Sequence, residues 1–120
     1  YGDIYNPINA TNLGCSIKYI NRLHHNPFII AIDSCLGQTE HIGYVTLASG
    51  PLCPGTGIKK ELPEVGNLHI TGIVNSYGNG SSLLHTTRLC TVVTLAKVIE
   101  NGILLAFNKE TLNSLPYTVQ

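Results

Sequence analysis

The strongest candidate for chemistry in this chain is an aspartate that follows an unbroken apolar run. Residues 27–37 read PFIIAIDSCLG, and Phe28 to Ile32 has no polar face, as is typical of a strand covered on both sides in a parallel sheet. Asp33 follows directly, where that strand is expected to end. Ligands of open α/β sheets gather at the carboxyl ends of strands. Asp33 is therefore predicted to be a catalytic carboxylate, and the alternative is a turn residue that accepts backbone N–H bonds.

Another strand is expected to bring further polar side chains to the same edge of the sheet. Leu68 to Asn75 reads LHITGIVN, is rich in β-branched residues and ends on an amide. Parallel strands end at one edge, so Asn75 is predicted to bind beside Asp33, with a turn role as its alternative. Glu40 and His41 follow the Asp33 turn and are predicted to reach that edge as a local pair.

Three roles are open to His69: a metal ligand, a base, or a strand residue hydrogen-bonded to the backbone. No second histidine stands at ligand spacing, which favours the last role. Asp33 and His69 supply two ligands, whereas a retained zinc needs three or four, so no metal or other cofactor is predicted. A Cys35 nucleophile paired with His41 or His69 is disfavoured, because the strained Gly-x-Ser-x-Gly type of elbow is absent.

A long connection at 49–66, SGPLCPGTGIKKELPEVG, is a second candidate for a site. Loops of this length in compact folds commonly bind ligands or act as lids. Its residues Gly55, Thr56 and Gly57 are predicted to contribute to binding. They do not form a nucleotide site, because the Gly-x-x-x-x-Gly-Lys-Ser/Thr spacing is missing and the loop does not join a strand directly to a helix.

The elements that position these residues follow from the apolar pattern. Helices are expected at 8–23 and 82–105, strands at 28–32, 43–48 and 68–75, and a surface tail at 108–120. The core face of the last helix is predicted to consist of Leu89, Val92, Val93, Ala96, Ile99 and Ile103. Helices that alternate with apolar strands indicate an α/β fold, a mostly parallel sheet between helices. Residues 1–120 are expected to form a single domain.

Composition narrows the class of partner. Seven basic and seven acidic residues leave no net charge, so a nucleic-acid surface lacks its electrostatic signature. No unbroken apolar stretch approaches the roughly 18 residues of a membrane span, and no leader is visible, so we expect a soluble, cytoplasmic protein. The four scattered cysteines are expected to be reduced thiols. The chain has no methionine and starts Tyr1-Gly2-Asp3, so we expect it to be the larger, C-terminal part of a longer chain.

Three segments carry a resemblance to a known family. IAIDSCLG at 30–37, GPLCPGTGIKKELPEVG at 50–66 and HITGIVN at 69–75 resemble the YyaC-type sporulation proteins of endospore-forming Firmicutes, as does the last helix with its Thr87-Arg88-Leu89. That family is distantly similar to the germination protease that degrades small acid-soluble spore proteins, and to hydrogenase maturation endopeptidases. The resemblance implies a three-layer α/β/α sandwich whose first strand and helix are missing from this chain.

The same resemblance implies what the site would do. Germination protease is regarded as an acid-type endopeptidase with two aspartates, and Asp33 matches the second of them. The first would stand upstream, in a Gly-rich turn that the chain does not contain, and Asp3 and Glu40 are the stand-ins to consider. The implied function is that of a sporulation protein with an endopeptidase-like site, in the mother cell or forespore. Its expected partners are small acid-soluble spore proteins or another sporulation protein, and self-association stays open. The alternatives are a non-catalytic factor that binds a protein partner through the 49–66 loop, and a maturation-type protein whose Asp33 and His69 contact nickel.

Overall fold

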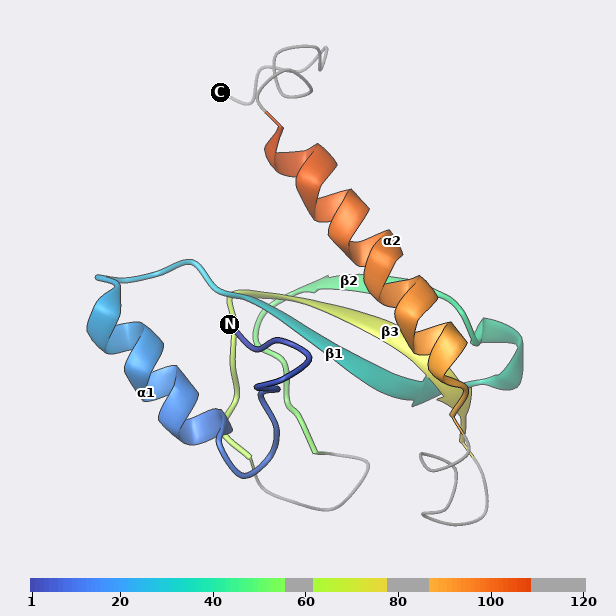
Figure 1. The fold of residues 1–120 in the computed structure, drawn as a ribbon, viewed down its shortest axis with the longest axis horizontal. Helices are drawn as coiled ribbons and strands as arrows, with labels where there is room; N and C mark the ends of the chain where they lie inside the picture. The colour runs from blue at the N-terminus through green and yellow to red at the C-terminus, as the bar shows by residue number, and fades with distance from the viewer. Residues whose placement is uncertain (56–61, 78–86, 109–120) are drawn as a thin grey trace.

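The fold, given by a computed structural model, is a small α/β structure described for residues 1–55, 62–77 and 87–108. Its elements run in the order α1 (Leu13–Leu23), β1 (Ile30–Gly37), a 3-10 turn η1 (Thr39–His41), β2 (Val45–Ser49), β3 (Leu68–Ser76) and α2 (Leu89–Phe107). Figure 1 shows α1 beside the end of the sheet where β1 begins. The second helix, α2, starts near the end where β1 and β3 finish, and then projects beyond the sheet.

The three strands form one mixed sheet in the order β1-β3-β2. β1 and β3 are parallel, as predicted, whereas β2 runs antiparallel to β3. The prediction of a mostly parallel sheet is therefore only partly right. The reversal starts at Gly43, whose φ of +93° suits a residue without a side chain, and whose N–H donates to the carbonyl of Ile73 at 2.8 Å. The chain thus turns back onto β3 without a crossover helix.

The first strand starts and ends later than the apolar run. It extends from Ile30 to Gly37, so Asp33 lies in its middle and pairs with Thr71 of β3 rather than standing at a strand end. The prediction that the strand ends at Asp33 is wrong. The small residues after Asp33 continue the ladder because their backbone groups find partners on β3 as far as Ser76, across a register irregularity between Cys35 and Leu36.

The last helix packs on β3 through a narrower face than predicted. Its buried residues are Leu95 and Ile99, whereas Leu89 is 75% exposed and Val92 and Val93 are not buried. Gly72 makes this approach close, since a Cβ at that position would stand 3.2 Å from the Leu95 Cδ1 atom. Of the predicted face only Ile99 is confirmed as buried. The expected start of the helix at 82 falls outside the described residues.

The apolar core is small and is shared by both helices and the sheet. It consists of Leu13, Ile20, Ala31, Ile70, Ile73, Val74, Leu95 and Ile99. Leu13 and Ile20 are the buried residues of α1, and this helix begins at Leu13 rather than at residue 8, where its start was predicted. Within the described residues, α2 is the one helix that is long and apolar enough to cross a membrane. The mean hydropathy of its best window is 1.7, and 11% of that window is buried. The sequence of α2 is not an unbroken apolar run, because single polar residues interrupt it, and for that reason no membrane-spanning segment was predicted.

Candidate functional site

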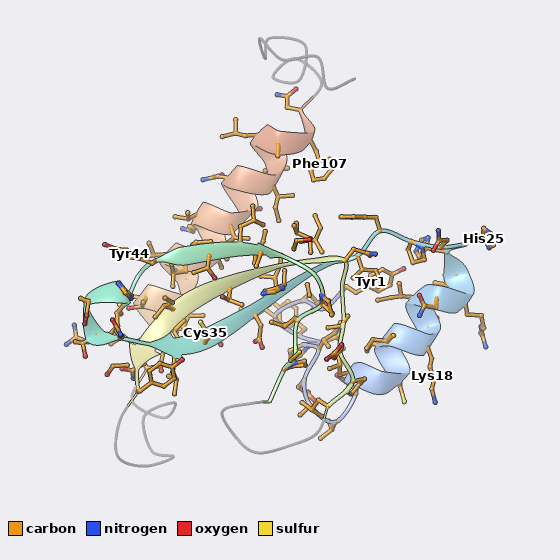
Figure 2. The ribbon with its side chains drawn as sticks, turned by 180° about the vertical axis from the view of Figure 1, so that it is seen from behind. Tyr1, Lys18, His25, Cys35, Tyr44 and Phe107 are labelled. Carbon is orange, nitrogen blue, oxygen red and sulfur yellow. The ribbon has the colours of Figure 1, made fainter. Side chains whose placement is uncertain are left out.

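A cavity of about 420 Å³ lies between α1, the first half of β1 and the loop that follows β2. The helix contributes Leu13, Ile17 and Ile20 to its wall, and β1 contributes residues 30–33. Figure 2 shows Tyr1, which also lines the cavity, between α1 and the sheet. Among the described residues of the wall, Asp33 alone has an acidic side chain. A carboxyl group in a mainly apolar cavity is the feature of this structure best suited to chemistry.

Two opposed influences set the protonation of Asp33. The residue is exposed as a whole, but partial burial of its carboxyl group against the surrounding protein raises its pKa above the ordinary value. The N–H of Ser34 donates to Oδ1 at 2.8 Å and opposes that rise, because it stabilises the ionised form. The burial effect is the larger one. Asp33 therefore holds its proton to a higher pH than a solvated carboxyl group, as a general acid requires.

The described part of the loop at 49–66, the second candidate for a site, borders the same cavity as Asp33. Leu52 and Val65 exchange backbone hydrogen bonds, N to O, at 2.8 and 3.0 Å, and this isolated bridge holds the two arms of the loop together. Both residues line the cavity, and so does Gly55. The other predicted binding residues of the loop, Thr56 and Gly57, lie outside the described residues.

Asn75 does not share this site. It pairs with Leu36, three residues beyond Asp33 in β1 and thus about 10 Å further along the sheet at the usual rise per residue. Its Nδ2 donates to the Thr87 hydroxyl at 3.4 Å, and its Oδ1 accepts from the N–H of Ser76 at 2.9 Å. The predicted pairing of a carboxylate with an amide at one edge is therefore wrong, because Asp33 is not at the end of its strand.

The predicted pair Glu40 and His41 also lies apart from the cavity. Both belong to η1, are exposed and do not contribute to the wall. The His41 ring instead stacks in a tilted arrangement on Tyr44, with 5.4 Å between ring centroids. The two residues stand at the carboxyl edge of β1, whereas the cavity opens beside the first half of that strand.

His69 anchors the start of the loop. Its Nδ1 lies 3.0 Å from the carbonyl oxygen of Gly50, and because a carbonyl only accepts, Nδ1 is the donor. The predicted role of a strand residue hydrogen-bonded to the backbone is confirmed. His69 pairs with Ala31, so it lies two residues before Thr71 on the same face as Asp33. Among residues 1–55, 62–77 and 87–108, no three His, Cys, Asp or Glu side chains gather as a metal site would require.

The four cysteines are free. Cys53 donates to the Glu64 carboxylate at 3.3 Å across the loop, and this bond raises the pKa of its thiol, as do slight burial and the nearby negative charge. A thiol held in its neutral form is a poor nucleophile.

The apolar wall contributed by α1 is the part of the site that sequence reasoning missed. Leu13, Ile17 and Ile20 stand at the helical spacing that predicts the first helix. Their spacing cannot tell a face that packs tightly from one that borders a cavity, because both are apolar. The missing information is the distance between α1 and β1, which the connection at 24–29 sets.

These features define a small α/β protein with a mixed three-stranded sheet and one acidic group in an apolar cavity. The chain belongs to the DUF1256 family, described as "Protein of unknown function", whose model matches residues 1–102. It is similar to "Uncharacterized protein YyaC" of Bacillus subtilis (strain 168), with 43% identity over 120 residues. The match covers 96% of this chain and 58% of that relative, so the chain spans little more than half of the relative's length. No solved structure matches.

Proposed function

We propose that this chain is the larger part of a sporulation-associated protein with a germination-protease-like endopeptidase site around Asp33. The observation that carries the proposal is the position of the Asp33 carboxyl group, on the wall of an apolar cavity and with its pKa raised. Acid-type hydrolysis needs one carboxyl group that is still protonated when it meets the substrate. Partial burial supplies that property at Asp33.

The shape and lining of the cavity favour a peptide as substrate. About 420 Å³ falls in the range of ordinary ligand sites and admits one or two side chains of a polypeptide. The walls from α1 and from Leu52 and Val65 are apolar, so we infer that an apolar side chain enters while the peptide bond lies against Asp33. Small acid-soluble spore proteins, or another sporulation protein in the cytoplasm of the mother cell or forespore, are the proposed partners.

The second carboxylate is proposed to come from the longer protein. Two-carboxylate hydrolysis requires an acid and a base with pKa values pushed apart, and Asp33 supplies only one of them. Asp3, considered above as a stand-in, is engaged in a turn, since its Oδ1 accepts from the N–H groups of Tyr5 and Asn6. The resemblance places the missing aspartate on a Gly-rich turn, and the chain spans only 58% of its relative.

The finer fold is part of the same proposal. Among the described residues, no strand pairs with the outer edge of β1, and the apolar side chains of Phe28 and Ile32 near it are 71% and 54% exposed. A strand and helix added there would convert the small mixed sheet into the three-layer α/β/α sandwich of the germination-protease and hydrogenase-maturation type. The new strand would also bring its own carboxyl end close to β1.

The test uses the longer protein and small acid-soluble spore proteins as substrate. Asp33→Asn is expected to abolish cleavage, because an amide neither donates nor accepts a proton at working pH. Asp3→Asn is the matched control, since it makes the same chemical change at an exposed turn residue, and it is expected to keep the parental rate. Parental cleavage by Asp33→Asn, with both variants folded, would show that Asp33 is structural.

One observation favours a second candidate, a non-catalytic factor that binds a protein partner. The cavity wall contains a single acidic group among the described residues, and the rest is mainly apolar, which also suits recognition of an apolar side chain without chemistry. A binding assay with Leu52→Asp separates the candidates. A pure binder loses its partner through this change and is unaffected by Asp33→Asn, whereas the peptidase is disabled by either.

A further inference from the structure

Three polar side chains form a row that crosses the whole sheet and starts at the cavity. Asp33 of β1 pairs with Thr71 of β3, and Thr71 pairs with Thr46 of β2. Paired residues project from the same face of a sheet. The Thr46 and Thr71 hydroxyl oxygens lie 2.6 Å apart and share a hydrogen bond. The opposite face of β3 at this level carries Gly72, against which Leu95 packs, so the row is on the side away from α2.

We propose that Thr71 is a positioning residue for the Asp33 carboxyl group, with its hydroxyl oriented by Thr46. Adjacent strands lie about 4.8 Å apart, so a hydroxyl and a carboxyl group at paired positions come within hydrogen-bond reach by side-chain rotation. The Asp33 Oδ1 atom is held by the N–H of Ser34. We therefore infer that Oδ2 is the oxygen that Thr71 would bind after this rotation.

The row responds to the protonation of Asp33 because each hydroxyl both donates and accepts. When Asp33 is ionised, Thr71 donates to the carboxylate and Thr46 donates to Thr71. When Asp33 is protonated, it donates to Thr71, which then donates to Thr46. Either atom of the Thr pair is able to donate, so both arrangements keep every bond. Thr46 is exposed, and solvent completes the row at its far end.

The titratable groups described near Asp33 are not placed to hydrogen-bond its carboxyl group as Thr71 is. Cys35 lies two residues along β1 on the same face, and His69 is the diagonal neighbour on β3, with its Nδ1 already bonded to Gly50. Tyr1 on the cavity wall makes a 2.6 Å hydrogen bond through its hydroxyl to His24. The α1 side of the wall contributes no charged residue among those described. Thr71 is thus the hydroxyl directly paired with the carboxyl group.

The role of Thr71 in catalysis rests on the proposed peptidase function, whereas the proposed hydrogen bond between Thr71 and Asp33 does not. The test measures that hydrogen bond directly. Asp3 and Asp33 are the two aspartates of the sequence. Labelling aspartate with ¹³C at the carboxyl carbon therefore gives two NMR titration curves, and Asp33→Asn assigns them. Asp3 is the internal reference in each sample.

Thr71→Val, which keeps the shape and removes the hydroxyl, is expected to move the Asp33 titration to higher pH, because the ionised form loses a donor. Thr46→Val is expected to produce a smaller shift in the same direction without touching Asp33. Thr71→Ser should restore the parental curve, and Thr39→Val in η1 should leave it unchanged.

If the Asp33 titration curve of Thr71→Val is the same as that of the parent, the proposal is overturned. It is also overturned if the Asp33 titration curve of Thr71→Ser is shifted as far as that of Thr71→Val. Unchanged dispersion of the NMR spectrum shows in each case that the variant is folded. If the titration shifts as expected while the longer protein cleaves nothing, the hydrogen bond stands and the peptidase function fails.

Discussion

At the scale of single residues, the two aspartates show how local geometry sets opposite acidities. Two backbone N–H groups donate to the Asp3 Oδ1 atom at 2.7 and 2.8 Å, and these bonds lower its pKa. Asp33 has one such bond, and partial burial outweighs it, so its pKa is raised. Because the chain has the same residue type in two environments, Asp3 serves as an internal reference for Asp33.

The opposite shifts predict opposite effects of pH on stability. The raised pKa of Asp33 means that the folded state holds this proton more tightly than the unfolded state, so Asp33 lowers the free energy of unfolding as pH rises from its unfolded to its folded pKa. As pH rises between these two pKa values, the free energy of unfolding of Asp33→Asn is expected to increase relative to that of the parent. At higher pH the difference between the two proteins is expected to stay constant. The lowered pKa of Asp3 gives a stabilising contribution that is present above its unfolded pKa and lost as pH falls through the folded one.

Thermal unfolding followed by circular dichroism between pH 3 and pH 7 checks both signs. The difference between Asp33→Asn and the parent should grow in favour of the variant as pH rises, and the difference for Asp3→Asn should grow in favour of the parent. Parallel curves for Asp33→Asn and the parent would mean that the Asp33 carboxyl group is fully solvated.

At the scale of elements, the attachment of α2 depends on a narrow contact with β3. Leu95 is 4% exposed and lies against Gly72, whereas Leu104 on the same helix is 63% exposed. Leu95→Ala is expected to lower the free energy of unfolding by about 2–5 kcal/mol, because it removes packed atoms and leaves a cavity. Leu104→Ala is the matched control, with an expected change within about 0.5 kcal/mol. Chemical denaturation measures both, and equal losses would contradict the proposed packing of α2.

The strands show which features of the fold the sequence could predict. The expected strand 68–75 matches β3 to within one residue, because its β-branched residues have turn signals on both sides. The predicted end of β1 was wrong because Asp33, Ser34 and Cys35 resemble a turn in composition. Only their pairing with β3 shows that they are extended. Nothing local to β2 distinguishes a parallel from an antiparallel partner.

Local sequence does not show which segments pack together, and this also explains the wrong predictions for the site and for α2. Asp33 and the loop could be predicted as candidates from residue type and loop length, and they do meet at one cavity. Asn75, Glu40 and His41 were placed there only through the assumed strand end. The prediction of the packing face of α2 was wrong because the helix is apolar on nearly every side. Its periodicity therefore does not indicate which of several apolar faces packs on the sheet.

At the scale of the whole molecule, the described residues expose many apolar side chains, on β1 and α2 above all, and such a surface is expected to be covered by protein or by lipid. The α2 helix is long enough for a membrane span, but Lys97 and Glu100 lie near its middle, where charged side chains are costly in lipid. Its buried residues Leu95 and Ile99 are also occupied by the contact with the sheet. A cover of protein fits these observations better than lipid does.

The free edge of β1 makes that cover testable by hydrogen exchange. In the part of the chain that the structure describes, β1 pairs on one side only, so its amide groups that point away from β3 are expected to exchange rapidly in this chain. If the longer protein adds a strand along that edge, the same amides become slow, and those of the outer edge of β2 stay unchanged as the internal control. Comparing the two proteins peptide by peptide measures this directly. Equal exchange in β1 would mean that no strand pairs there, and the proposed source of a second carboxylate beside Asp33 would be lost with it.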